Sequence, residues 1–471
     1  MLAPLVLSAC GAVNGWFCSD SRCEWTDTEW AWVQSLANPP DPPPDPTNQF
    51  LFDPRAAPLG QAFYFDTQFS GNATQLTAIK GPSPLARAAV GQPINVSCAT
   101  CHDPGKGGID ATSVPGNVSV GAGWTDVNAL PTVNAAYRNV LFWNGRADSL
   151  WSLNVAVSES STTMNGTRLA IAHRIFDAYR ADFEPLFGAL DPAIDSLPPD
   201  GKPGTGAYDA LSSQLHDEVT RVLVNWAKAI EAYEYQLVSR NSPFDQFVAA
   251  GKDSDLISGA AKRGARLFVG KGSCVDCHSG PLLTDEQFHD IGVPQTGLAV
   301  PTTSDCPAND PNCDCVTDPK PLVCGDSTTP STIPTCAPDG ARVGLARLHC
   351  NIKWLRRSST FSDDTNDHSR DAYVDHALTP DLVGQWRTPS LRDVALTAPY
   401  MHDGSLATLE DVIWHYNRGG AAESGERIGV PAAELRPLML TNDEVSDLVA
   451  FLETLTGAPL STSLITAPPA R

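Results

Sequence analysis

Two stretches of the sequence govern the rest of the chain: Cys98–His102, with the sequence CATCH, and Cys274–His278, with the sequence CVDCH. Each has the form C-x-x-C-H, the attachment signature of c-type haem. In such a site two thiols bond to the porphyrin, and the imidazole beside the second thiol binds the iron. A C-x-x-C disulfide or half of a zinc site would be the alternative, but no second Cys pair or spaced His pair stands nearby to complete a tetrahedral zinc shell. The sequence therefore predicts two covalently bound haem c groups, attached through Cys98, Cys101, Cys274 and Cys277, with His102 and His278 as iron ligands.

The composition indicates a globular protein of more than one domain. The chain has 471 residues, 42% of them apolar, which is enough for sizeable cores. Its formal net charge is −22, from 32 basic and 54 acidic residues, and this excess of acid argues against binding to nucleic acid or to an anionic membrane surface. The charge fits a basic electron-transfer partner, and it fits solubility alone equally well. No stretch approaches the run of apolar residues that a transmembrane helix needs.

The use of cysteine indicates an oxidising compartment. Besides the four haem anchors and Cys10, eight of the 13 cysteines remain, and this even number suggests about four disulfides in the periplasm. Cys18 and Cys23 are placed for a local pair, whereas the other six lie between residues 306 and 350 with open connectivity. Cys10 ends the tetrapeptide LSAC, which is typical of a bacterial lipobox, although residues 1–9 contain no Lys or Arg. We therefore expect a periplasmic protein that is lipid-anchored through Cys10.

The chain divides into an N-terminal segment and two haem domains. Residues 1–50 contain the lipobox-like start, a short helix and a proline-rich linker, in which Pro39–Pro46 is expected to form a stiff polyproline spacer. The first haem domain is expected over 51–245 and the second over 246–471. The second domain carries an insertion at 300–370 that is rich in Pro, Asp, Thr and Cys, and we interpret it as a disulfide-stapled loop.

Helical patterns dominate the sequence, and strand-like alternation is scarce. A Gly stands one turn before large apolar residues ahead of each haem motif, at Gly60 and at Gly264, and such a Gly allows one helix to pack closely on another. Residues 212–238 carry an amphipathic stripe, and a capping box at Thr441–Glu444 opens a helix that ends near Gly457. The expected fold class is therefore mainly α, with two cytochrome c-like haem domains, long loops and a tandem, imperfect duplication.

From about residue 29 to residue 457 the chain resembles the bacterial diheme cytochrome c peroxidase and MauG family. Matching motifs occur in order around the two haem motifs: Phe142–Arg146 (FWNGR), Phe288–Gly292 (FHDIG), Thr388–Val394 (TPSLRDV) and Thr397–Gly404 (TAPYMHDG). The resemblance implies that the N-terminal domain is peroxidatic, because its haem meets hydrogen peroxide. It implies that the C-terminal domain transfers electrons through its own haem.

The resemblance also assigns roles to residues between the two haems. Trp143 matches the tryptophan that relays electrons from one haem to the other, although an aromatic core residue would have the same spacing. Asn128, Thr397 and Pro399 match positions that hold a calcium ion, the last two through backbone carbonyls. Oxygen-only donors of this kind suit Ca²⁺. We therefore expect a catalytic relay at Trp143 and a calcium site close to it.

The sixth ligand of the second haem departs from the commonest pattern of the family. Many members have Met at the position 14 residues after the His of the His-Asp-Gly motif, whereas here that position after His402 is Tyr416, as in MauG-like members. His402 itself, Met401 and His415 are competing candidates. A Met ligand raises the haem potential, and an oxygen ligand should lower it. We expect Tyr416 as the ligand, because the resemblance places it there.

The first haem shows two further departures. Classical members of the family block the resting peroxidatic iron with a His soon after the first haem motif, but the next histidine after His102 is His173, so we expect an iron that is open at rest. Members also carry an acid–base Glu just before a Met, and here Thr163 precedes Met164. Since O–O cleavage requires a positioned acid–base group, the nearest carboxylate, Glu159, is the candidate, with a water chain through Thr163 as the alternative.

The expected activity is that of a diheme c-type cytochrome peroxidase, which reduces hydrogen peroxide with electrons that a small cytochrome c or cupredoxin returns. A MauG-like enzyme, which uses peroxide to oxidise Trp or Tyr of a protein substrate, is the alternative that Tyr416 and the missing histidine favour. A non-enzymatic diheme electron carrier would have both irons saturated, so cyanide or peroxide would leave its ferric spectrum unchanged. A diheme oxygenase would instead consume O₂ with a polyisoprenoid or similar substrate.

Overall fold

The computed structural model describes residues 18–19, 22–74, 88–113, 115, 118–125, 127–293, 340–350, 355–420 and 429–471. Over these residues the protein is mainly helical, with two sheets of two short strands each, which confirms the predicted fold class at this level. None of the described helices combines the length and the apolar character needed to cross a bilayer. Cys10, much of the 300–370 insertion and the side chains of its six cysteines lie outside the described residues.

The elements fall on either side of the second haem motif. The helices before it are α1 (Asp27–Ser35), α2 (Ala56–Phe65), α3 (Cys98–Cys101), α4 (Leu150–Glu159), α5 (Arg168–Ala178), α6 (Arg180–Phe187), α7 (Gly206–Asp209), α8 (Ser213–Glu234), α9 (Pro243–Ala250) and α10 (Gly259–Val269). Those after it are α11 (Ala341–Cys350), α12 (Asp371–Val374), α13 (Leu409–Asn417), α14 (Asn442–Glu453) and α15 (Thr462–Ile465). The strands are β1 (Cys18–Ser19), β2 (Arg22–Cys23), β3 (Phe288–His289) and β4 (Trp386–Arg387), paired antiparallel as β1 with β2 and β3 with β4.

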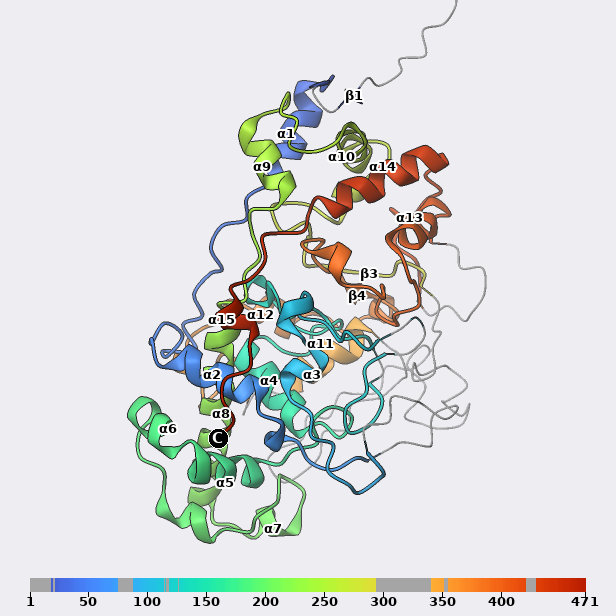
Figure 1. Ribbon diagram of the computed structural model, residues 1–471. Coiled ribbons are helices and arrows are strands. Elements are labelled where there is room, and N and C mark those ends of the chain that lie inside the picture. The colour runs from blue at the N-terminus through green and yellow to red at the C-terminus, as the bar shows by residue number, and fades with distance from the viewer. Residues whose placement is uncertain are drawn as a thin grey trace, which may run out of the picture.

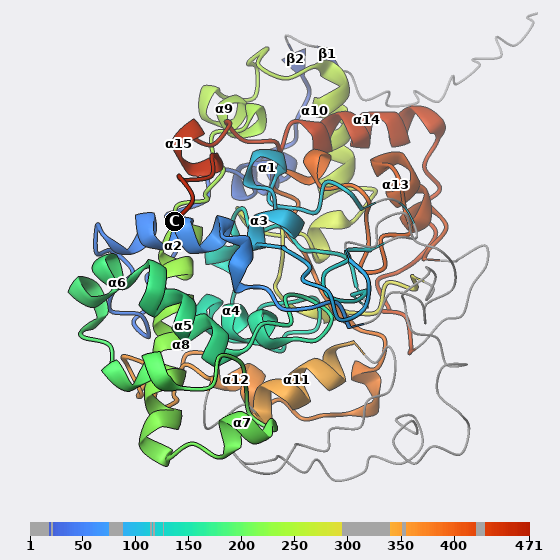
Figure 2. The same cartoon turned by 60° about the horizontal axis from the view of Figure 1, so that its bottom comes forward.

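Figure 1 shows two groups of helices, with α10, α13 and α14 at one end of the molecule and α2, α5, α6 and α8 at the other. Each group has its own core of buried apolar residues. The strands β3 and β4 lie between the two groups, and the turned view in Figure 2 shows the same separation.

A crossing of α2 and α8 forms the centre of the first group. A side chain at Gly60 could not be accommodated there, because its Cβ would lie 1.8 Å from the carbonyl oxygen of Ala229. Ser212 caps α8 by accepting a hydrogen bond from the backbone of Leu215, and the stripe predicted over 212–238 is buried. The helix ends four residues earlier than predicted, at Glu234.

A crossing of α10 and α14 forms the centre of the second group in the same manner. The Cβ of a residue at position 264 would lie 1.9 Å from the carbonyl oxygen of Asp447, so Gly264 is again the residue of closest approach. The predicted capping box is present, since Thr441 and Glu444 bond each other's backbone N–H groups. The helix ends at Glu453, somewhat before the predicted Gly457.

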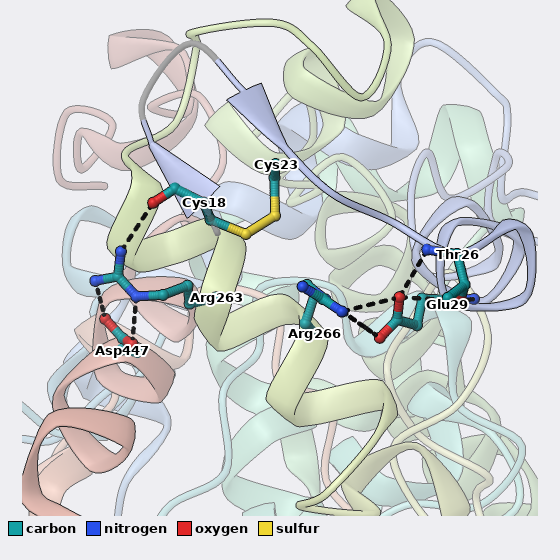
Figure 3. Close-up of a disulfide and its surroundings, with 7 residues drawn as sticks. All are labelled: Cys18, Cys23, Thr26, Glu29, Arg263, Arg266 and Asp447. Atoms are coloured by element: carbon teal, nitrogen blue, oxygen red, sulfur yellow. Dashed lines mark hydrogen bonds and ion pairs between the residues drawn. A yellow bond between two sulfur atoms is a disulfide. The ribbon is translucent and has the colours of Figure 1, made fainter. Parts of the chain in front are cut away.

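The N-terminal segment packs against this second group (Figure 3). The predicted disulfide between Cys18 and Cys23 is present and joins β1 to β2. Arg263 of α10 donates to the carbonyl of Cys18 at 3.2 Å and forms a bidentate ion pair with Asp447 of α14 at 2.7 Å. A second cation on α10, Arg266, pairs with Glu29 of α1 at 2.9 Å.

The proline-rich linker is in contact with the body of the protein rather than extended as a spacer. Tyr137 and Tyr235 donate their hydroxyls to the carbonyls of Pro40 and Pro43, at 2.6 and 3.1 Å. Asp45 forms a buried ion pair with Arg357 at 2.6 Å. A run of prolines has a restricted backbone whose carbonyls remain free to accept hydrogen bonds. The donors found here could not be predicted from sequence periodicity.

The C-terminal segment returns to the first group of helices. Gln61 of α2 donates to the carbonyl of Ser463, and Tyr233 of α8 donates its hydroxyl to the carbonyl of Leu464. Figures 1 and 2 both place the C-terminus beside α2. Each group of helices is therefore covered by a terminal segment from the far end of the sequence.

Candidate haem sites and the contacts between them

The first C-x-x-C-H motif forms a single helical turn, α3, that ends at its histidine. Ser97 and Thr100 form a capping box at the start of this turn. The imidazole of His102 donates Nδ1–H to the carbonyl of Gly108 at 3.1 Å, which leaves Nε2 as the nitrogen that carries the lone pair. Removal from water lowers the pKa of His102, so the ring is neutral, the form that binds a metal.

The second motif repeats this arrangement. Cys274–Asp276 form a 3-10 turn, and the imidazole of His278 donates Nδ1–H to the carbonyl of Leu283 at 3.0 Å. Removal from water lowers the pKa of His278 as well. In both motifs the hydrogen bond fixes the ring and its tautomer, as in metal-ligating histidines generally.

The thiols of the two motifs fit covalent attachment of a porphyrin. All four cysteines are reduced and partly buried, and none of them forms a disulfide. Removal from water raises the pKa of Cys98, and it raises that of Cys274 to about 12. The donor set therefore fits two haem c groups, each with one imidazole ligand and two thioether positions.

Trp143 connects segments from both halves of the chain. Its indole N–H donates to the carbonyl of Asn128 at 2.9 Å, and its own carbonyl accepts from the backbone N–H of Arg387 in β4 at 2.8 Å. The backbone N–H of Asn128 in turn donates to the carbonyl of His402 at 2.7 Å. Trp143 thus stands where the segment near the first motif meets the segments that follow the second.

The three residues expected to hold calcium lie partly together. The side-chain amide of Asn128 donates Nδ2–H to the carbonyl of Pro399 at 2.8 Å, across 271 residues of sequence. Thr397 is two positions before Pro399 and donates its hydroxyl to the carbonyl of Val394. The structure therefore brings Asn128 and the Thr397–Pro399 turn into one neighbourhood.

Tyr416 lies on α13 and faces the second haem motif. Removal from water raises the pKa of its phenol, and the neighbouring thiols of Cys277 and Cys274 raise it further. Among the competing candidates, His415 uses Nε2 in a 2.8 Å contact with the carbonyl of Ile291, and His402 stacks on an indole. The placement beside these cysteines is compatible with Tyr416 as a haem ligand, which stays a prediction.

Glu159 has a partner in the structure. Its two carboxylate oxygens accept from Nε and Nη2 of Arg168 at 3.0 and 2.7 Å, and the same guanidinium donates to Thr220. Thr163, the other residue expected near the peroxide, donates its hydroxyl to the carbonyl of Val157. An acid–base role for Glu159 stays a prediction, and the ion pair adds a role in holding α4 to α5.

Glu234 is a residue of the first site that the sequence analysis missed. It lies at the end of α8, is 2% exposed, and accepts a hydrogen bond from Nδ2 of Asn154 in α4 at 2.9 Å. Burial raises its pKa to about 8, and its charge would raise the pKa of Cys98 and of Tyr64, whose hydroxyl donates to the carbonyl of His102. The signal was present, because Glu234 follows Ile230 by one helical turn on the buried stripe.

A stack of aromatic rings is the second feature that was missed. The indole of Trp386 and the imidazole of His402 are stacked, with ring centroids 4.3 Å apart and planes at 17°. The His402 ring also contacts Trp143, with ring centroids 6.4 Å apart and an angle of 73° between the ring planes. These residues are remote in sequence, so no local pattern could have predicted their contact.

Known proteins resemble the chain over most of its length. A family model described as di-haem cytochrome c peroxidase matches residues 54–254. Cytochrome-c peroxidase IdrP1 of Denitromonas iodatirespirans is 30% identical over 88% of this chain and 85% of that protein. Methylamine utilization protein MauG of Methylorubrum extorquens is 26% identical over 87% of this chain and 81% of that protein. The diheme peroxidase BthA of Burkholderia thailandensis shares the fold, with a TM-score of 0.55 and 21% identity over 88% of this chain and 90% of that chain.

Proposed function

Because the chain belongs to the di-haem cytochrome c peroxidase and MauG family, it is an oxidoreductase, and we propose that it reduces hydrogen peroxide with electrons relayed between two covalently bound haem c groups. The observation that carries this proposal is the matched pair of C-x-x-C-H motifs, in each of which the imidazole donates Nδ1–H to a backbone carbonyl. A lone motif would fit a simple carrier. Two motifs joined through Trp143 fit an enzyme that collects electrons at one site and uses them at the other.

The residues of the chain hold and orient the groups that react. When bound, the two haem groups would supply the electron transfer and the cleavage of peroxide. His102 and His278 would bind the irons through Nε2, and the carbonyls of Gly108 and Leu283 make these nitrogens stronger donors. Reduction of peroxide also consumes two protons, and Glu159 or a water chain through Thr163 would deliver them.

The two sites would differ in their free axial position. The second site would be closed by Tyr416, and this assignment is supported by its position near Cys277 and Cys274, whose thiols add to the raised pKa of its phenol. The first site would be open at rest, because the sequence has no histidine between His102 and His173. An open first site and a closed second site assign peroxide to the first and electron entry to the second.

The division into an N-terminal segment (1–50), a peroxidatic domain (51–245) and an electron-transfer domain (246–471) belongs to the same proposal. A tandem duplication is supported by the two helix crossings, α2 with α8 and α10 with α14, each closest at a Gly that precedes its haem motif. The insertion at 300–370 would belong to the second domain.

A calcium ion would hold the segments between the sites. Asn128 and Pro399 already lie together, and a half-turn of the Asn128 amide would present its oxygen in place of its nitrogen. With the carbonyls of Thr397 and Pro399 this gives three oxygen donors, the ligand type that Ca²⁺ prefers.

The partners would be hydrogen peroxide and a small electron-donor protein, a cytochrome c or cupredoxin. The net charge of −22 supports a basic donor and does not support nucleic acid as a partner. Localisation in the periplasm is supported by the local disulfide of Cys18 and Cys23. Lipid attachment at Cys10 is part of the proposal and concerns a residue outside the described ones.

The experiment adds one equivalent of hydrogen peroxide to the fully oxidised protein and then supplies reduced cytochrome c. We expect the peroxide to be consumed and the cytochrome to be oxidised with a ratio of two electrons to one peroxide. A ferric spectrum that neither cyanide nor peroxide changes would overturn the proposal and indicate a simple electron carrier.

A second function is favoured by Tyr416, the residue shared with MauG-like members. In that case peroxide would oxidise Trp or Tyr side chains of a protein substrate. Peroxide consumption that is independent of any reduced cytochrome, and that modifies Trp or Tyr of an added periplasmic protein, would support this function over the first.

A further inference from the structure

The stack formed by Trp386, His402 and Trp143 has no role in the function described so far beyond Trp143 itself. Trp386 is 8% exposed and His402 is 2% exposed, so the rings are shielded from water. Trp386 lies face to face with His402 at 4.3 Å, and His402 lies edge to face with Trp143 at 6.4 Å. The imidazole of His402 therefore lies against both indoles.

One end of the stack reaches the first haem motif. The N–H of Trp143 donates to the carbonyl of Asn128. Further along the same segment, the backbone N–H of Thr132 donates at 3.0 Å to the carbonyl of Gly108, which also accepts Nδ1–H of His102. The segment from Asn128 to Thr132 thus links Trp143 to the surroundings of His102.

The other end of the stack reaches the second motif. In the β3–β4 pair, Trp386 stands opposite His289. The His289 side chain lies within 4.8 Å of the thiol of Cys277 and pairs with Asp285 at 2.8 Å. The carbonyl of Thr388, two residues after Trp386, accepts the hydroxyl of Thr284 at 2.7 Å, and the neighbouring carbonyl of Leu283 accepts Nδ1–H of His278. Trp386 therefore belongs to the surroundings of the second haem.

The chemistry of the three rings suits transfer of single electrons. Indole is among the side chains most readily oxidised by loss of one electron, whereas imidazole is not. The indole N–H of Trp143 has a carbonyl acceptor, which stabilises positive charge on that ring, but the N–H of Trp386 has no acceptor among the described residues.

We propose that Trp386 is a second electron-relay residue, which passes single electrons to Trp143 across the ring of His402 and so links the surroundings of His278 to those of His102. The proposal rests on the proposed function, because peroxide takes two electrons and two protons to give two water molecules. Each electron leaves the second site, and Trp386 and Trp143 each lose one and regain one in turn. No bond in either side chain forms or breaks.

The test removes one electron from the holoprotein with a photogenerated oxidant strong enough to oxidise indole, and follows the redistribution of the oxidising equivalent between the two haems by absorbance. In Trp386→Phe the ring still covers His402 but is much harder to oxidise, and we expect redistribution to slow by at least about tenfold. Trp386→Tyr, which restores an oxidisable ring, should recover part of the rate. Trp32→Phe, at a tryptophan on α1 that is 46% exposed, is the matched control and should leave the rate unchanged.

A second readout does not depend on the transfer rate. After one equivalent of peroxide without any donor, peptide mass mapping should find oxidised Trp386 in the wild type, and the trapped radical signal in electron paramagnetic resonance should lose a component in Trp386→Phe. Near-ultraviolet circular dichroism and the haem content of each variant establish that the fold is intact.

Two results would overturn the relay. One is an unchanged redistribution rate in a correctly folded Trp386→Phe, and the other is a slowed rate that Trp386→Tyr does not restore, since that would indicate packing rather than electron transfer. Because the oxidising equivalent is generated by light, the outcome does not depend on peroxide turnover. A wild type that redistributes the oxidising equivalent and yet fails to reduce peroxide would therefore count against the proposed function alone.

Discussion

The ionisation of the buried carboxyl group of Glu234 differs between the folded and the unfolded chain. Glu234 ionises only near pH 8 in the folded protein, because burial between α4 and α8 raises its pKa from 4.5 to about 8. In the unfolded chain it ionises near 4.5. The unfolded state therefore releases this proton first, and folding stability falls as the pH rises from about 4.5 to about 8.

Glu234→Gln should remove this contribution. We expect the variant to lose a slope of about 1.4 kcal/mol per pH unit in the free energy of unfolding over that window, and to be more stable than the wild type at pH 8. Urea unfolding at pH 5 and pH 8 measures the difference. Asp217→Asn, on the exposed side of the same helix, is the control, and an identical pH profile in wild type and Glu234→Gln would contradict the assignment.

The ion pair of Glu159 and Arg168 separates a structural role from a catalytic one. Glu159→Gln leaves the mostly buried guanidinium without its counter-charge and should cost about 1–3 kcal/mol of stability, whereas the double variant with Arg168→Met should recover most of that loss. Thermal unfolding measures both. If Glu159 also delivers protons, the rate of peroxide reduction stays low in the double variant, and a rate equal to the wild type would rule out that role.

Single functional residues could be predicted from the sequence where covalent bonds, to haem or between cysteines, fix the spacing of the residues. The iron ligands could be predicted from the two C-x-x-C-H motifs, because covalent haem attachment fixes the spacing of the residues. The disulfide between Cys18 and Cys23 could be predicted because the two residues are separated by a short loop. Trp386 could not be found, since its partners His402 and Trp143 come from segments that only the tertiary fold brings together. Glu234 could have been found from its position on a buried stripe.

At the scale of elements, the packing of each half depends on one helix crossing, and a glycine stands at the point of closest approach in each crossing. Gly60→Ala or Gly264→Ala would place a methyl group within 2 Å of a carbonyl oxygen of the crossing helix. We expect each change to cost at least about 2 kcal/mol, because the helices must separate to admit it. Gly206→Ala, which meets no atom within 4 Å, is the matched control, and chemical denaturation compares the three. Equal stabilities would contradict the packing.

Helix prediction succeeded where stripe and cap agreed. The α14 helix begins at its predicted cap and α8 begins at the start of its predicted stripe, and their ends were misplaced by a few residues because no Gly or Pro forces termination there. The proline-rich segment was misjudged as a spacer, because polyproline sequence describes stiffness and not what the segment contacts. Its contacts with Tyr137, Tyr235 and Arg357 are tertiary.

At the scale of the whole molecule, the net charge of −22 governs encounter with a donor protein. The second-order rate of electron delivery from a basic cytochrome c should fall as salt rises from 10 mM to 200 mM, by about tenfold or more, because screening shortens the reach of the field. Stopped-flow mixing measures this rate. An acidic donor should show the opposite trend, and a rate independent of salt for both would contradict electrostatic steering.

Each terminal segment of the chain packs on the half of the protein that is farther from it in sequence. The N-terminal segment lies on α10 and α14, and the C-terminal segment lies on α2 and α8. A gene split near residue 245 would consequently yield two fragments. Each fragment would lack the terminal segment that covers its own helices and would carry the terminal segment that covers the helices of the other. Neither product should be expected to mature alone, and co-expression of both pieces would be the only route by which such a dissected molecule could reassemble.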